Sequence, residues 1–171
     1  MVDAPAATRG FTLIELMVTL AVLAILLTVA LPNFQIFVMN GRMASQTNDL
    51  ITALNLARSE AVKRAANVTV CASSDGASCT GSWAAGWIVR DAAGTPIRVQ
   101  RALGSGSTLT GGTDVASAIT FTASGRTTIP TTATVATTTL TLCPPSPAAV
   151  QGRAIQIERT GRSRFAPVAC P

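Results

Sequence analysis

Residues Gly10–Leu31 read GFTLIELMVTLAVLAILLTVAL, and this stretch decides the architecture of a chain of 171 residues. Glu15 is its only charged side chain, and the next charge along the chain is Arg42. Because a helix of about 20 apolar residues crosses the hydrocarbon core of a bilayer, the stretch predicts a membrane span. Arg9 precedes the span and no base follows it closely, so we expect the N-terminus in the cytoplasm and the rest of the chain exported.

Two ordinary kinds of apolar N-terminus do not explain this span. A secretory signal peptide fits poorly, because the apolar run is too long and no A-x-A-like cleavage site follows it. A simple single-span anchor explains the hydropathy but not a carboxylate near the start of the helix, which is costly in hydrocarbon without a partner. Cleavage after Gly10 would give Phe11 a free ammonium group that neutralises Glu15 of an adjacent subunit. The pattern therefore predicts an assembly in which this pair sets the register between helices.

The sequence GFTLIEL at Gly10–Leu16 resembles the prepilin processing site of type IV pilins and type II secretion pseudopilins. The resemblance implies cleavage after Gly10 by a dedicated prepilin peptidase, methylation of the new N-terminal Phe11, and a role for Glu15 in assembly. Residues 1–10 would then be a leader peptide. The implied partners are other pilins, contacted through the N-terminal helix, the inner membrane and the peptidase.

We expect the transmembrane and filament-core helix, residues 11–31, to continue as an amphipathic helix over residues 32–66. Pro32 lies inside the helical pattern, where a proline removes a hydrogen bond, so it predicts a kink or a locally melted stretch. Small and apolar side chains then recur every three or four residues, which is the spacing of a helix face that packs on a domain. They are Leu50, Leu54, Ala57, Ala61 and Ala65. The pattern predicts one helix from about Thr12 to Ala66.

Residues 67–171 have the pattern of a β-rich periplasmic head, with short runs of β-branched residues between turn residues. The candidate strands are Asn67–Ala72, Gly86–Asp91, Pro96–Ala102, Ala118–Thr122, Thr139–Cys143, Ala154–Arg159 and a short last one at Arg164–Val168. The Gly/Ser-rich stretch around 104–114 indicates a linker, and the Thr-rich stretch around 127–141 indicates an edge hairpin or a loop. The predicted fold class is α+β: a long N-terminal hydrophobic helix packed on a small antiparallel β-sheet head with two disulfides.

The four cysteines, Cys71, Cys79, Cys143 and Cys170, predict disulfides rather than a metal site. Their spacing is unlike that of a compact zinc site, and the chain has no His to complete one. An exported domain favours disulfides, and four cysteines allow three connectivities. Proximity along the sequence favours Cys71–Cys79 and Cys143–Cys170.

The composition argues against an enzyme. Without His the chain lacks the commonest general base, and no nucleophile elbow or pair of carboxylates stands out. We therefore predict a non-catalytic chain with no cofactor and no metal. From Arg126 to the C-terminus there are five Arg and a single acid, Glu158. This asymmetry predicts a local anion-binding surface.

Further motifs resemble the GspH/FimT/FimU group of minor pilins and pseudopilins. They are ARSEA at 57–61, WIV at 87–89 after a small cysteine loop, Phe121 with Gly125-Arg126, and GRSR at 161–164. The last resembles the GRxR motif of FimT-type pilins. That resemblance implies DNA binding during uptake for natural transformation.

The residues around Gly161 are compatible with DNA binding. Gly161 follows a strand and is typical of a turn that needs an unusual backbone angle. Arg162 and Arg164 lie two apart in an extended segment and would share one face, with Arg159 beside the turn. Three guanidinium groups there would contact the phosphates of double-stranded DNA independently of its sequence. The other interpretation is a hairpin whose Arg side chains pair with Glu158 or with the C-terminal carboxylate.

The sequence therefore predicts a minor type IV pilin, a membrane-anchored filament subunit for pilus assembly or priming. It would lie in the bacterial inner membrane with its head in the periplasm, and then in an extracellular pilus or a periplasmic pseudopilus. The alternative is a GspH-like pseudopilin of a type II secretion system, which acts in protein export across the outer membrane. Both readings share the anchor, Glu15 and the head, so the sequence leaves the choice open.

Overall fold

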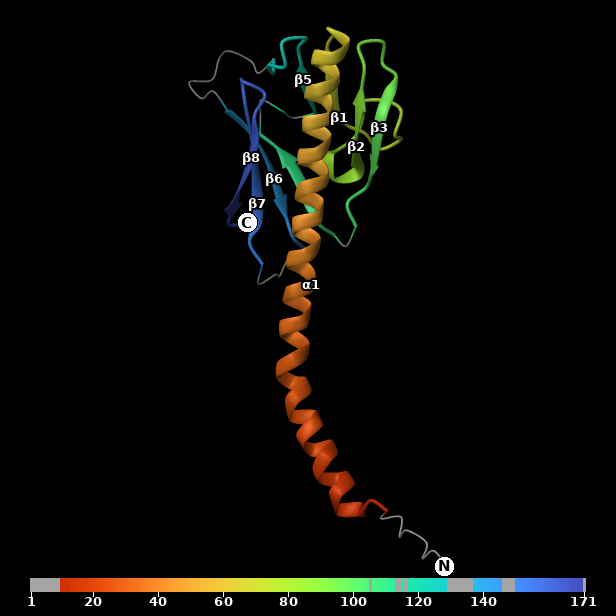
Figure 1. Ribbon diagram of the computed structural model, residues 1–171, viewed down its shortest axis with the longest axis vertical. Coiled ribbons are helices and arrows are strands. Elements are labelled where there is room, and N and C mark those ends of the chain that lie inside the picture. The colour runs from red at the N-terminus through yellow and green to blue at the C-terminus, as the bar shows by residue number, and fades with distance from the viewer. Residues whose placement is uncertain are drawn as a thin grey trace, which may run out of the picture. The chain divides into compact units, whose positions relative to one another are not determined.

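A computed structural model describes residues 10–104, 106–112, 115, 117–128, 137–145 and 150–170. The expected leader up to residue 9, and residues 129–136 of the Thr-rich stretch, lie outside the described residues. The chain forms two compact units, one up to Val38 and one from Met39 on. We call residues 11–38 the anchor segment and the unit from Met39 on the head. Helix α1 (Leu13–Arg64) contributes residues to both units (Figure 1).

Helix α1 begins and ends within two residues of the predicted bounds, Thr12 and Ala66. It is continuous through Pro32, so the locally melted stretch that the proline predicted is not formed. At the C-terminal end Ala65 takes a left-handed conformation with φ 50°, and Ala66 donates its backbone N–H to the carbonyl of Ala61 (3.2 Å). This bond pattern closes many helices, although the left-handed position is usually glycine.

The head contains two four-stranded sheets rather than one small sheet, and all neighbouring strands pair antiparallel. The first sheet has the order β3-β2-β1-β5 and the second the order β4-β6-β7-β8. The strands are β1 (Val68–Ala72), β2 (Gly86–Arg90), β3 (Pro96–Arg101), β4 (Thr108–Gly111), β5 (Ala118–Phe121), β6 (Thr137–Cys143), β7 (Gly152–Glu158) and β8 (Ser163–Val168). The predicted helix-on-antiparallel-sheet fold is therefore confirmed, with its strands divided between two sheets.

Strand β4 lies in the Gly/Ser-rich stretch for which the sequence predicted a linker. Leu109 is its only large apolar residue, so the local pattern is too weak to indicate a strand. Pairing with β6, which places Leu109 opposite Leu142, supplies the hydrogen bonds and the burial. Strand β6 itself begins at Thr137 and lies between β4 and β7. This end of the Thr-rich stretch is therefore an interior strand and not an edge hairpin.

The core of the head joins α1 to both sheets in one hydrophobic cluster. Four members of the predicted helix stripe belong to it, namely Leu50, Leu54, Ala57 and Ala61, and each is at most 1% exposed. The fifth, Ala65, is exposed because the helix has already ended. Figure 1 shows the helix lying across both sheets. The stripe therefore marks the face on which the sheets pack, as its spacing predicted.

Both predicted disulfides are present, with Cα–Cα separations of 5.4 Å for Cys71–Cys79 and 5.9 Å for Cys143–Cys170. The first closes the loop that follows β1, and the second joins the end of β6 to the segment after β8. Each sheet thus carries one covalent link. A buried indole adds a polar link, because Trp83 donates its Nε1–H to the carbonyl of Val115 (3.1 Å).

Candidate assembly segment and arginine turn

The anchor segment exposes the apolar side chains that the sequence assigned to a membrane span. Within the described residues α1 is the one helix long and apolar enough to cross a bilayer, with a mean hydropathy of 2.6 over its most apolar stretch and none of that stretch buried. Phe11 is 83% exposed and Leu26 is 61% exposed. Side chains of this kind are stable only in lipid or against other apolar helices.

Glu15 lies in the first turn of α1, where it takes part in a capping box that the sequence analysis missed. Glu15 donates its backbone N–H to the hydroxyl of Thr12 (3.3 Å), and Thr12 donates its own N–H to Oε2 of Glu15 (3.5 Å). The spacing Thr-x-x-Glu just before an apolar run is the sequence signature of this motif. Among the described residues, the hydrogen bonds of Glu15 thus lie within the first turn of the helix.

Strands β7 and β8 are joined by a tight turn over Glu158–Arg162, which we call the arginine turn. Gly161 donates its N–H to the carbonyl of Glu158 (2.8 Å), and Glu158 donates its own N–H to the carbonyl of Arg162 (2.9 Å). Gly161 has φ 79°, the left-handed conformation expected at the last position of a three-residue hairpin loop. A Cβ at this position would collide with the carbonyl oxygen of Gly125. Gly161 therefore lies in a turn and has the unusual backbone angle that the sequence predicted for it.

The three arginines at this turn differ in their surroundings. Arg162 is exposed, and its side chain has no hydrogen bond or ion pair with the part of the chain that the structure describes. Arg164 lies 3.5 Å from Glu158 (Nη2 to Oε1) and donates Nε–H to the amide oxygen of Gln156 (3.1 Å). Arg159 is half-buried, and its Nε has no hydrogen-bond partner among the described residues. Pairing with Glu158 thus occurs for Arg164 but not for Arg162.

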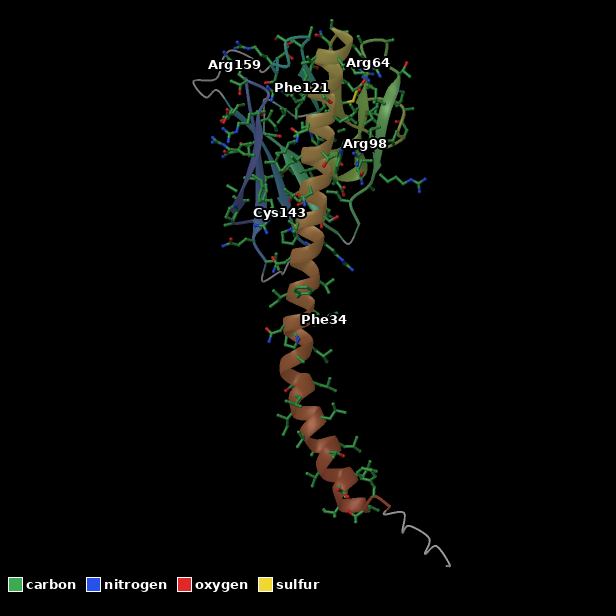
Figure 2. All side chains as sticks on the ribbon, viewed as in Figure 1. Phe34, Arg64, Arg98, Phe121, Cys143 and Arg159 are labelled. Carbon is green, nitrogen blue, oxygen red and sulfur yellow. A yellow bond between two sulfur atoms is a disulfide. The ribbon has the colours of Figure 1, made fainter. Side chains whose placement is uncertain are left out.

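Arg64, the last residue of α1, is paired with carboxylates of the head. Arg64 binds Glu60 through Nε (2.7 Å) and lies 3.4 Å from Asp91 through Nη1. The hydrogen bond from Arg64 lowers the pKa of the Glu60 carboxyl. Figure 2 shows Arg64 and Arg159 on opposite sides of the end of the helix. Arg64 is therefore paired with two carboxylates, whereas Arg162 at the arginine turn has no ion pair among the described residues.

The described residues contain no group of three or more His, Cys, Asp or Glu side chains that could hold a metal ion. All four cysteines are bonded in the two disulfides. The chemistry that the head presents at the arginine turn is the donation of charge-assisted hydrogen bonds by guanidinium groups.

Comparison with known proteins places these features in a family. The family described as type II transport protein GspH matches residues 46–161, and the prokaryotic N-terminal methylation motif matches residues 6–31. No protein with a curated description matches the sequence.

Two crystal structures of the type IV minor pilin FimU from Pseudomonas aeruginosa are similar to this chain. One, in space group P21, has 25% sequence identity and a TM-score of 0.59, and the match covers 77% of this chain and 92% of that chain. The other, in space group P65, has 25% identity and a TM-score of 0.55, with coverage of 72% and 92%.

The matches divide the candidate sites into two groups. The methylation motif includes Gly10, Phe11 and Glu15. The GspH match ends at Gly161, so Arg162 and Arg164 lie just beyond it and DNA binding is no part of what it implies. The methylation motif, the GspH match over more than half of the chain and the FimU-like fold agree, and this chain belongs to the GspH/FimT/FimU group of type IV pilin-like proteins.

Proposed function

We propose that the chain is a minor type IV pilin whose head also binds duplex DNA through the arginine turn. Prepilin peptidase removes the leader after Gly10, Phe11 is methylated, and the anchor segment holds the subunit in the inner membrane with its head in the periplasm. The methylation motif, the apolar helix and the likeness to FimU, itself a type IV minor pilin, support this proposal. The chain is non-catalytic, and its role lies in assembly and binding.

Assembly uses the anchor segment. Its exposed apolar side chains leave the membrane only when the same surface is covered by the helices of other pilins in the filament. The carboxylate of Glu15 then forms an ion pair with the ammonium group of Phe11 of an adjacent subunit, which donates a hydrogen bond to it. A pair of this kind compensates two charges that would each be costly in an apolar helix bundle.

DNA binding rests on one observation above all, the exposed Arg162 with no partner among the described residues. Arg164 joins it, because its side chain remains 53% exposed beside Glu158. An exposed ion pair contributes only about 0–1 kcal/mol, so a phosphate replaces Glu158 at little cost. Both groups donate to phosphate oxygens, and phosphate contacts carry no base information, so binding is independent of sequence.

The test measures binding of a fluorescent 30-base-pair duplex to the full chain in micelles of an uncharged detergent. We expect binding that weakens with salt, with a log–log slope of roughly −2 to −3 for two or three phosphate contacts. The variant Arg162→Ala/Arg164→Ala should lose most of this binding, and a duplex of scrambled sequence should bind equally well. An unbound duplex at low salt would refute DNA binding and leave a purely structural subunit.

A second candidate function is that of a type II secretion pseudopilin, which the description of the matching family favours. Such a subunit would form part of a periplasmic pseudopilus in protein export. Deletion in the source bacterium separates the two. Loss of pilus-dependent motility and of transformation supports the pilin, whereas retention of exported proteins in the periplasm supports the pseudopilin.

A further inference from the structure

The head contains a second turn with the same sequence pattern as the arginine turn. Residues 124–127 read SGRT and residues 160–163 read TGRS, so each has a hydroxyl residue, Gly, Arg and a hydroxyl residue in that order. We call residues 122–126 the second turn. It follows strand β5, whereas the arginine turn joins β7 to β8. The two turns with this repeated pattern therefore adjoin strands of different sheets.

The two turns also have the same backbone geometry. In the second turn Gly125 donates its N–H to the carbonyl of Thr122 (2.8 Å), and Thr122 donates to the carbonyl of Arg126 (2.8 Å). These bonds have the same positions and almost the same lengths as those of the arginine turn, which are 2.8 and 2.9 Å. Gly125 has φ 73°, against 79° for Gly161. Each turn thus places an arginine directly after a left-handed glycine.

The turns lie against each other at the end of the head where α1 ends (Figure 1). Thr127 donates its N–H to the carbonyl of Arg159 (3.1 Å) and its hydroxyl to the carbonyl of Glu158 (3.0 Å). Arg58 of α1 donates its Nε–H to the carbonyl of Gly125 (3.1 Å). The helix and the backbone of both sheets therefore hold the two turns in a fixed relation.

Each turn presents an arginine that has no carboxylate partner among the described residues. The side chain of Arg126 is exposed and, like that of Arg162, has no hydrogen bond or ion pair with any residue the structure describes. Glu158, the single acid in the chain after Arg126, is committed to Arg164 and Thr160. The two turns thus bring two cations without a partner among the described residues to adjacent backbone segments, and such cations can donate charge-assisted hydrogen bonds to an anion with several charges.

We propose that the two turns form one phosphate-binding site, in which Arg126 contacts the DNA backbone as a partner of Arg162. This inference rests on the proposed DNA binding and extends it to a residue on the other sheet. Each arginine directly follows the glycine of its turn, and the backbones of the two turns are in contact, so the two side chains can reach neighbouring phosphates of one strand. Arg58 is a positioning residue, because its bond to Gly125 holds the second turn in place.

The experiment compares single substitutions in the full chain, in micelles of an uncharged detergent, by the anisotropy of a fluorescent 30-base-pair duplex over a salt series. Arg126→Ala should weaken binding roughly five- to tenfold at 0.1 M salt and reduce the log–log salt slope by about 0.9, the change expected for one lost phosphate contact. Arg162→Ala should do the same. Arg126→Lys should keep most of the slope, because it keeps the charge.

Arg101→Ala is the matched control, since Arg101 is exposed on β3, at the edge of the first sheet farthest from β5. It removes one positive charge and should leave the slope unchanged. Thermal unfolding of each variant should match that of the parent chain, because the described contacts of the second turn involve the backbone of Arg126 and not its side chain.

The outcomes separate this inference from the proposed function. If Arg162→Ala weakens binding and Arg126→Ala behaves like Arg101→Ala, the chain binds DNA through the arginine turn alone and the paired site is wrong. If the parent chain does not bind the duplex, DNA binding and the paired site both fail. Equal losses of slope for Arg126→Ala and Arg162→Ala, with no loss for Arg101→Ala, would establish the pair.

Discussion

Residues 13–38 and 39–64 belong to one continuous helix, α1, but among the described residues only the second half packs in the hydrophobic core of the head. In the head half Leu54 is 1% exposed and packs in the core with residues of both sheets. In the anchor half Leu26 is 61% exposed, and its most apolar stretch has no buried residue. The same residue type on the same helix thus stabilises the fold in one half and is left for lipid or other subunits in the other.

This difference indicates which half of the helix is buried by its own chain and which is buried by lipid or by other subunits. Burial of a side chain within the chain contributes to folding whether or not the subunit is assembled. An exposed apolar surface of the size of the anchor segment marks a contact with something outside the chain. Substitutions should therefore change folding in the head half and assembly in the anchor half.

The largest effect is expected for Glu15→Ala, which should leave the subunit in the membrane but remove it from filaments. A buried ion pair that loses one partner costs roughly 3–5 kcal/mol, because the other charge stays buried and uncompensated. Incorporation should therefore fall by about tenfold or more. Immunoblots of sheared filaments and of the membrane fraction measure the two quantities.

Glu15→Gln controls for the capping box between Glu15 and Thr12. Glutamine keeps the ability to cap but has no charge, so it should be as defective as alanine if the pair with Phe11 of a neighbour matters. Normal incorporation of Glu15→Gln with poor incorporation of Glu15→Ala would assign the role of Glu15 to capping instead. Normal incorporation of both would contradict the ion pair.

The next largest effect is expected when the same substitution, leucine to alanine, is made once in each half of the helix. Leu54→Ala should lower the free energy of unfolding of the head by about 2–5 kcal/mol, because it leaves a cavity in the core. Leu26→Ala should change it by less than about 0.5 kcal/mol. Thermal unfolding of the full chain in detergent micelles, followed by the fluorescence of the buried Trp83 and Trp87, measures both. Equal destabilisation by the two variants would contradict the division of α1.

The helix of the anchor half and its methylation motif could be predicted from sequence, because their signals are local. Seven contiguous residues, Gly10–Leu16, suggest the processing site, and the apolar run that follows gives the span. The capping box of Thr12 and Glu15 was equally local, and the Thr-x-x-Glu spacing would have revealed it. Periodicity likewise predicted the buried stripe of the head half, as far as Ala61.

The head was harder to predict where contacts join distant segments. Strand β4 owes its existence to pairing with β6, and no local pattern around Leu109 shows this. The contact of Gly125 with Gly161 joins turns of different sheets, so their common SGRT and TGRS patterns gain meaning only once the fold brings them together. The pairing of Arg164 with Glu158 follows from the register of β7 and β8, which the hairpin turn sets.

The hydrogen bonds of two carboxylates, Glu15 in the anchor segment and Asp75 in the head, differ in a similar way. Glu15 of the anchor segment makes its described contacts within one helical turn. Asp75 of the head instead lies in the loop closed by Cys71–Cys79, where it accepts hydrogen bonds from the hydroxyl and N–H of Ser78 (2.5 and 2.9 Å), the N–H of Ala77 (2.9 Å) and the hydroxyl of Ser73 (2.9 Å). These bonds, above all the one from the Ser78 hydroxyl, hold the pKa of the Asp75 carboxyl well below its ordinary value.

The smallest effect is expected for Asp75→Asn, which should lower the melting temperature of the head less than Leu54→Ala does. Because the folded state lowers the pKa of Asp75, the carboxylate stabilises the head fully above the unfolded pKa of about 4 and loses this effect as the pH falls towards the lower folded value. The gap in melting temperature between parent and variant should therefore be constant from pH 7 to about 5 and should narrow below about 4. Ser78→Ala, which removes one donor and leaves the two backbone donors in place, should give a smaller gap that narrows over the same pH range. A gap in melting temperature that stays constant down to pH 2.5 would contradict this prediction. It would mean that the negative charge of Asp75 does not stabilise the head, and that the variant differs through the hydrogen bonds and packing of the asparagine side chain.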